Sequence, residues 1–208
     1  RTPISYIPTN TGYRLLIADN SSESSRRNAN LNVNYRYTDS LSREWNIDAD
    51  YGFFRIKSNQ MQPNYYYNFN GNTEQSRTIY NMIAPTNIDI ATFKTDYEQP
   101  FKKGKIGVGA KISYVQTNNN FERYNVYTSN KTLDTLRSNN FDYKENINAA
   151  YVNYNGQYKN INIQIGVRAE NTNATGQSTG FKQNGTGYTT YDSTFKRNYT
   201  DLFPSAAI

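Results

Sequence analysis

Three carboxylates on one short segment are the residues of this chain best suited to chemistry. Asp48 and Asp50 lie two positions apart, and Glu44 precedes them on the same segment. Paired carboxylates can act as general acid and base, or they can hold a cation such as Ca²⁺. The sequence places no positioned base or pocket around them. We therefore interpret them as charges that pair with groups on neighbouring strands.

The chain contains no cysteine and no histidine. Their absence excludes disulfide frameworks, Cys or His zinc sites, thiol nucleophiles and any Ser-His or Cys-His relay. We expect no catalytic residue, no metal site and no cofactor, and we predict that the protein is not an enzyme.

A Gly-rich stretch from Gly104 to Lys111 contains the residue types of a phosphate-binding loop. That loop requires Gly-Lys-Ser/Thr at the start of a helix, whereas here Ala110 separates Gly109 from Lys111. Apolar and polar residues alternate through Tyr114, which indicates a strand. The glycines then allow tight packing or bending of a sheet.

The formal net charge is +6, with a pI of about 9.3. The basic residues are scattered, and the densest group is Lys102, Lys103 and Lys105 in a turn. A nucleic-acid site would need a patch or stripe of such residues. We therefore interpret the charge as a solvated surface and expect no nucleic-acid partner.

Aromatic residues with amide neighbours occur in three long polar stretches. Such rings can stack on the C–H faces of sugars while Asn side chains bond to the hydroxyls. The alternative is that these stretches form small hairpins in which the rings pack among themselves. The third stretch contains Tyr188 and Tyr191. The candidate ligand-binding residues come from the first two stretches: Tyr65, Tyr66, Tyr67, Phe69, Phe121, Tyr124 and Tyr127.

Apolar and polar residues alternate with a period of two along much of the sequence, and this alternation predicts the strands that carry these residues. Leu31, Val33, Tyr35 and Tyr37 alternate with polar residues, and the segments 43–54, 104–116 and 160–171 behave in the same way. Period two places apolar and polar side chains on opposite faces of a strand. Strands of soluble proteins are mostly about 5–6 residues long, whereas a tilted strand that crosses a bilayer needs about 9–11. The aromatic content of 15% excludes disorder for most of the chain.

The connections between strands alternate in length. Short turns are expected near 38–42, 99–104 and 156–160, and long loops near 58–85, 117–143 and 173–194. In an up-and-down sheet, alternate connections lie at opposite ends, so one end has only tight turns. This arrangement is typical of outer-membrane barrels, and aromatic residues near the strand ends fit the interfacial girdles of such barrels. No run of about 18 apolar residues predicts a transmembrane helix.

The sequence therefore predicts an all-β fold of antiparallel up-and-down strands, a partial segment of a large transmembrane β-barrel. Residues 28–208 would supply about seven strands. Residues 1–27 would add a strand and a loop whose place in the barrel the sequence does not give, with a strand at 13–18. Residues 1–10 lack the apolar region of a signal peptide, so we expect a cytosolic protein or a piece of a longer precursor. Polar residues predicted to face the lumen are Asn46, Asp48, Asp50, Lys111, Arg168 and Glu170.

Several motifs of the chain resemble the outer-membrane β-barrel family of TonB-dependent receptors. Asp96-Tyr97-Glu98-Gln99-Pro100-Phe101 precedes a short turn and an alternating strand. The most specific part is Gly166-Val167-Arg168-Ala169-Glu170, followed by a long stretch and Asp201-Leu202-Phe203-Pro204-Ser205. The resemblance covers roughly residues 28–208.

The resemblance implies a wall segment of a barrel of about 22 strands, plugged by a separate domain, in the outer membrane of a Gram-negative bacterium. Such receptors bind a nutrient, often a glycan or a metal chelate, and import it with energy from the TonB system. The implied partners are outer-membrane lipid, the plug domain, TonB and the nutrient. The chain departs from the family pattern because it has no plug, no TonB-binding box and only about a third of the strands.

Two alternatives remain open at this point. A soluble β-sandwich that binds carbohydrate would also be rich in Tyr and Asn, but its apolar faces would meet each other. A small complete barrel of about eight strands would act as an adhesin or anchor. If the chain is a segment, its lateral strands present unpaired backbone groups, and we expect edge-strand self-association of the isolated chain.

Overall fold

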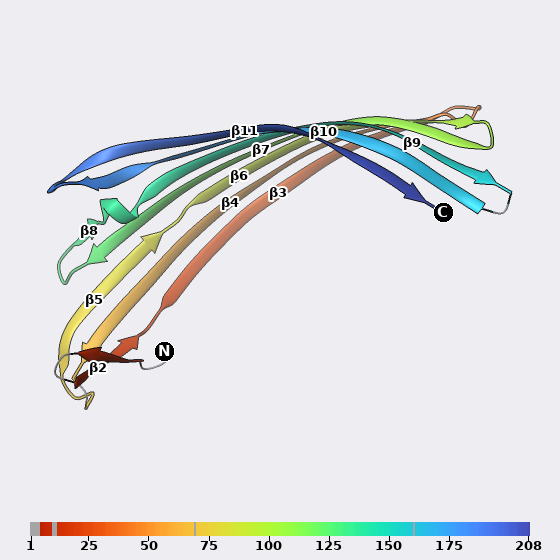
Figure 1. Ribbon diagram of the computed structural model, residues 1–208. Coiled ribbons are helices and arrows are strands. Elements are labelled where there is room, and N and C mark those ends of the chain that lie inside the picture. The colour runs from red at the N-terminus through yellow and green to blue at the C-terminus, as the bar shows by residue number, and fades with distance from the viewer. Residues whose placement is uncertain (1–4, 10–11, 69, 160) are drawn as a thin grey trace.

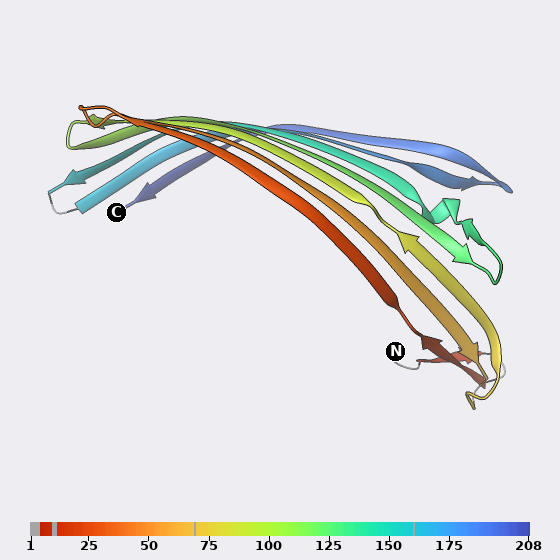
Figure 2. The ribbon, with the colours of Figure 1, turned by 180° about the vertical axis from the view of Figure 1, so that it is seen from behind.

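The computed structural model describes residues 5–9, 12–68, 70–159 and 161–208, which form one curved antiparallel sheet (Figures 1 and 2). A single short 3₁₀ helix, η1 (Thr135–Arg137), interrupts the strands of this described part. The strands are β1 (Ser5–Thr9), β2 (Gly12–Ala18), β3 (Ser21–Thr38), β4 (Glu44–Tyr67), β5 (Glu74–Ile83), β6 (Thr86–Phe101), β7 (Gly104–Val126), β8 (Lys131–Leu133), β9 (Asn139–Tyr158), β10 (Ile161–Asn184) and β11 (Gly187–Ala207).

The long strands follow the chain as an up-and-down meander, as the sequence predicts. β3 pairs with β4, β4 with β5 and β6, both of these with β7, and then β9, β10 and β11 follow in order. β5 and β6 are one strand interrupted at Ala84 and Pro85, because proline has no N–H to donate to the ladder. Counted in this way, seven long strands make up the sheet.

Short turns join the strands at one end of the sheet, on the right of Figure 1. Residues 39–43 join β3 to β4, Lys102 and Lys103 join β6 to β7, and Lys159 follows β9 before β10 begins at Ile161. Each turn places one non-glycine residue at positive φ: Ser42, Lys102 and Lys159.

Much of the sequence that we expected to form long loops is hydrogen-bonded strand. β4 continues to Tyr67, β7 to Val126 and β10 to Asn184. The connections at the end of the sheet opposite the short turns are therefore shorter than the expected loops 58–85, 117–143 and 173–194. The sequence hides these strand extensions because their apolar and aromatic residues, such as Met61 and Phe121, are few and do not alternate regularly with polar ones. Strand pairing there depends on backbone hydrogen bonds and on cross-strand amide and hydroxyl contacts.

One face of the sheet is apolar, and it is uncovered. We call it the apolar face; it carries Leu31, Val33, Ile112 and Ile165, each at least half exposed. The few apolar residues that are buried in the described part are Leu15, Ala149 and Ala174. A β-sandwich would need a second sheet against this face, whereas the described strands belong to a single layer.

The apolar residues form a slanted band across the sheet. Ile47 is the second apolar residue of β4, counted from the short turn. Its cross-strand partners run through Thr95, Ala110 and Ala150 to Ala169. Ala169 is the fifth apolar residue of β10, counted from the short turn of that strand. Between β4 and β10 the band thus shifts by three apolar positions, which correspond to six residues or about 20 Å along the strand. The four interstrand steps from β4 to β10 total about 19 Å across the sheet. A level apolar band therefore requires strands tilted by about 45°, as in membrane barrels.

The N-terminal hairpin of β1 and β2 extends the sheet at the end opposite the short turns. Leu15, Leu16, Ile17 and Ala18 pair with the last residues of β4, and Leu15 is buried there. The described residues contain no helix that is long and apolar enough to cross a membrane.

Candidate functional site: the polar face and the rim of the sheet

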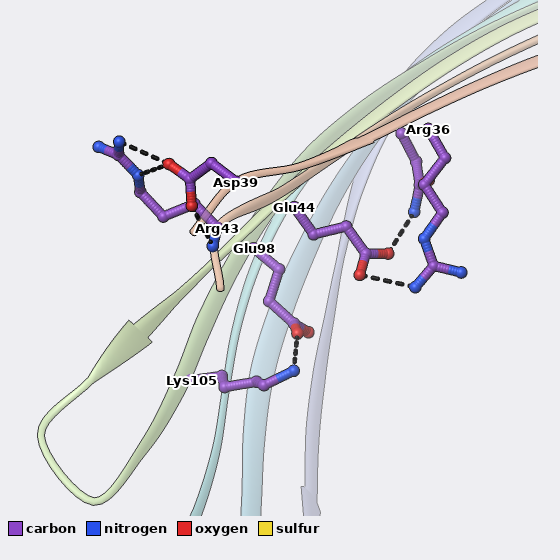
Figure 3. Close-up of polar contacts among 7 residues, drawn as sticks. Arg36, Asp39, Arg43, Glu44, Glu98 and Lys105 are labelled. Carbon is purple, nitrogen blue, oxygen red and sulfur yellow. Dashed lines mark hydrogen bonds and ion pairs between the residues drawn. The ribbon is translucent and has the colours of Figure 1, made fainter. Parts of the chain in front are cut away.

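The polar face of the sheet carries a row of charges next to the short turns (Figure 3). Glu44 and Glu98 are cross-strand partners on β4 and β6. Arg36 on β3 lies 2.7 Å from Glu44, and Lys105 on β7 lies 2.6 Å from Glu98. Alternation along the strands puts the four residues on one face, so that two neighbouring carboxylates are flanked by two cations.

The same face continues into a second polar group centred on Asp96. Lys94 forms an ion pair with Asp96 at 2.7 Å, and the Tyr151 hydroxyl donates a hydrogen bond to Asp96. The Tyr151 ring crosses Gly109, its partner on β7; a Cβ at Gly109 would lie 2.4 Å from the ring. Glycine at this position therefore allows the tyrosine to reach the carboxylate.

The six residues that we predicted to face the lumen lie within this charged region or beside it. Asp48 and Asp50 accept hydrogen bonds from Asn34 and Asn32 on β3, and Asn46 donates to Glu44. Arg168 forms an ion pair with Glu170 at 2.8 Å, and its guanidinium lies 5.8 Å from the centre of the Tyr151 ring. Lys111 is the cross-strand partner of Lys94. The paired carboxylates thus take part in cross-strand contacts, and their role toward a plug stays a prediction.

Sequence reasoning did not identify Arg36, Lys94, Asp96, Glu98 and Tyr151 as members of this site. Arg36 and Glu98 meet their partners across short hairpin turns, whereas Tyr151 reaches Asp96 from 55 positions away, and in each case the register brings the side chains together. The one usable signal is period two, which places Asp96 and Glu98 on the same face as Lys94.

The candidate ligand residues fall into two groups, both at the end of the sheet opposite the short turns. Tyr65, Tyr66 and Tyr67 end β4 and pair with β2 and β5. The guanidinium of Arg77 lies 5.9 Å from the Tyr65 ring centre, and that of Arg14 lies 5.8 Å from the Tyr66 ring centre. Phe69 lies outside the described residues.

The second group lies at the end of β7. The Tyr124 hydroxyl donates to Glu122, and the Lys131 ammonium lies 4.4 Å from the Tyr124 ring centre. Tyr127 follows β7 directly and is 59% exposed. Phe121 lines a cavity of about 440 Å³ together with Tyr191, which belongs to the third aromatic stretch. The Tyr65–Tyr67 run does not line that cavity.

A one-layer antiparallel sheet with a slanted apolar band on one face and a charged opposite face defines a class of protein, the membrane β-barrels. The family model described as the outer membrane protein beta-barrel family matches residues 36–208. The chain belongs to this family, and its place is the outer membrane of Gram-negative bacteria.

Three of the solved structures that this chain resembles are outer-membrane receptors or transporters. They include the ferric yersiniabactin uptake receptor FyuA from Yersinia pestis, with 13% identity, a TM-score of 0.46, and 94% of this chain covering 35% of that one. The ferric citrate transporter FecA in the unliganded form shows 13% identity, a TM-score of 0.36 and coverages of 96% and 37%. The siderophore receptor PiuA from Acinetobacter baumannii shows 10% identity, a TM-score of 0.41 and coverages of 91% and 39%.

This chain spans little more than a third of the length of those receptors. A search of curated proteins found no match.

Proposed function

We propose that this chain is part of the barrel wall of a TonB-dependent receptor, which binds a nutrient at the cell surface and imports it across the outer membrane. The nutrient would be a glycan, a metal chelate or a similar compound. A plug domain and the TonB system would be the partners in the full-length protein. The role is binding and transport, with no catalysis by this segment.

The observation that carries the proposal is that the sheet has an apolar face on one side and a charged face on the other. Arg36, Glu44, Glu98 and Lys105 lie on the face of the sheet opposite the apolar face. Such a density of charge requires water or a polar domain in front of it. A barrel with a plugged or wet lumen supplies both.

The motif resemblance supports the same assignment. Arg168 and Glu170 of the first motif are the cross-strand partners of Phe203 and Asp201 of the second. The two segments on which the resemblance mostly rests are therefore neighbours in the sheet, although a long hairpin separates them in sequence. By the usual orientation of bacterial barrels, the short turns would face the periplasm and the cavity end would face the exterior.

Growth of the source bacterium tests the import role. A strain that lacks the full-length receptor would be compared with one that lacks TonB, on neutral hexasaccharides as sole carbon source and on ferric citrate as sole iron source. We expect both strains to lose growth on the same one of these nutrients. Loss in the TonB strain alone, on every nutrient, would contradict the proposal.

The residues predicted to face the lumen allow a sharper test in the full-length receptor. Replacing Arg168 and Glu170 with glutamine (R168Q/E170Q) should lower uptake of the nutrient found above severalfold, because their contact with the plug is weakened, while surface binding is retained. Lys196→Gln on the opposite face of β11 is the matched control and should transport normally. Equal uptake by both variants would argue against plug contact at this site.

A further inference from the structure

The apolar face of the sheet carries basic residues just beyond the apolar band, on the side away from the short turns. Arg55 and Lys57 continue the alternation of Phe53 along β4, and Arg27 is the cross-strand partner of Arg55 on β3. Lys144 on β9 belongs to the cross-strand row that starts at Phe53. The four basic side chains therefore lie on the apolar face, opposite the charged face.

The slant of the apolar band places Lys57 and Lys144 at the same level. Lys144 lies three interstrand steps from Phe53 along its row, through Asp89 and Gln116. The band shifts by three apolar positions over four steps, so three steps correspond to about two positions. Lys57 is two such positions beyond Phe53 on β4. With strands tilted by about 45°, both lysines lie about 9 Å farther along the membrane normal than Phe53.

This level coincides with the headgroup layer of a bilayer. Phe53 is the last of the alternating apolar residues of β4, and the headgroups extend about 5–8 Å beyond the hydrocarbon on each side. A lysine stem can lie along the apolar surface while its ammonium group reaches the headgroups. Lysine and arginine side chains at this depth are attracted to anionic lipid.

The ammonium groups of Lys57 and Lys144 are available for a ligand. Both side chains are exposed, and neither forms an ion pair within the part of the chain that the structure describes. Arg55 is by contrast occupied, because it pairs with Asp89 at 2.7 Å. Arg27 lies on the edge strand β3, where the next strand of a barrel would be its neighbour.

The acidic side chains of this region leave the two lysines unneutralised. Asp142 lies one position beyond Lys144 on the apolar face of β9 and accepts a hydrogen bond from Asn118 at 2.8 Å. Glu23 on β3 lies one position beyond the cross-strand partner of Lys57, and the two form no ion pair among the described contacts. An anion at either ammonium group therefore meets a free positive charge.

Amide side chains lie at about the same level on the neighbouring strands. Asn173 donates a hydrogen bond to Asn171 at 2.7 Å, and Asn171 donates to Asn198 on β11 at 2.9 Å. These contacts hold the amides in place between the apolar band and the water. Their remaining donors and acceptors suit the phosphate oxygens and hydroxyl groups of a lipid headgroup.

We propose that Lys57 and Lys144 each bind a phosphate group of a membrane-lipid headgroup at the outer surface of the barrel wall. The two lysines are about 20 Å apart, so each takes a separate lipid. Lipid is the molecule that meets this face at this level, and phosphate supplies the negative charge that the two ammonium groups lack. The assignment depends on the position of the wall in the membrane and is independent of the import function.

Lipid binding to the detergent-solubilised full-length receptor tests the proposal. The probes are lipid A with its phosphates and the same lipid A with the phosphates removed, titrated in mixed micelles, with native mass spectrometry to count bound lipid. We expect the phosphorylated form to bind about fivefold more tightly at each site. The preference should shrink at about 0.5 M salt, because salt screens exposed charges. Equal binding of the two forms at low salt would overturn the proposal.

Inorganic phosphate is the third probe, and it separates a lipid site from a site for the free anion. We expect it to leave bound lipid A in place when both are present at equal concentration. Displacement of lipid A under these conditions would overturn the assignment to a lipid headgroup.

Variants assign the binding to the two lysines. Lys57→Gln and Lys144→Gln should each weaken the binding of phosphorylated lipid A at one site by about fivefold, and the double variant should lose the preference for phosphate. Lys144→Arg keeps the charge and should bind as the unaltered receptor does. Lys182→Gln is the matched control, because Lys182 is exposed on the opposite face of β10. A double variant that still prefers phosphorylated lipid A would refute the two sites.

Discussion

Asp39 organises the turn between β3 and β4 through several hydrogen bonds. Its carboxylate accepts from the backbone N–H groups of Leu41 and Arg43, both at 2.9 Å, and from the Arg43 guanidinium at 2.6 Å. The turn lies outside the apolar band, in water. The backbone N–H of Arg43 is the main cause that lowers the pKa of Asp39 below its usual value, followed by the Arg43 side chain.

This lowered pKa gives the turn a defined pH response. The folded-state pKa of Asp39 lies below the unfolded value of about 3.9, so its stabilising effect is complete above that value. The effect is lost as the pH falls through the folded-state pKa. We expect the carboxyl-carbon NMR signal of Asp39 to titrate below about pH 3.9. Titration at or above that value would show that the hydrogen bonds are absent, and Arg43→Gln should move the midpoint only partway up.

The pairing of Gly109 with Tyr151 makes a second prediction at the scale of single residues. Gly109→Ala places a Cβ against the Tyr151 ring and the Asp96 carboxylate, so that the ring must move. We expect a loss of about 1–3 kcal/mol in unfolding free energy, as for other overpacked sites. Urea titration of the full-length barrel in detergent measures it.

Two further variants separate this mechanism from a general intolerance of alanine in strands. Gly187→Ala meets nothing closer than 3.8 Å and should be neutral. Combining Gly109→Ala with Tyr151→Ala should cost less than the sum of the two changes, because the smaller side chain removes the clash. Additive losses would refute the contact.

At the scale of elements, the sequence predicts the strands that cross the membrane and misses their extensions. Ile161, Ile163 and Ile165 reveal their strand because lipid on one face and polar groups on the other enforce alternation. β9 begins at Asn139 and Asn140, where the two faces of the strand do not differ in polarity. The register that brings Tyr151 to Asp96 is likewise outside the reach of a single sequence, because it depends on pairing between distant strands.

The slant of the apolar band locates the depth of individual side chains. Ile165 is the third of the five apolar residues on β10 and lies at mid-band, whereas Ile161 lies at its edge. Ile165→Arg should therefore lower folding stability in lipid vesicles by about 2–4 kcal/mol, and Ile161→Arg by about 0–1. Urea titration of the refolded full-length barrel is the measurement. Equal costs at the two positions would contradict the depths assigned along β10.

At the scale of the whole molecule, the open sheet leaves two kinds of surface uncovered. The apolar face is exposed over its full width, and β3 and β11 each have one partner among the described strands. We expect the isolated chain to aggregate in water through both surfaces, and detergent to restore small particles. Light scattering with and without detergent distinguishes the outcomes. A clean monomer in plain buffer would mean that the apolar face is buried against something else.

The length of the strands has a consequence for how this wall changes over time. β4 and β10 each contain 24 residues, which at a tilt of about 45° gives about 55 Å of height, of which the apolar band needs about 25 Å. The remainder stands clear of the lipid as rigid sheet. A surface built in this way can acquire a preference for a different ligand through single amino-acid substitutions on a fixed backbone, with no insertion or deletion. The membrane-embedded half of the sheet is unaffected by such substitutions.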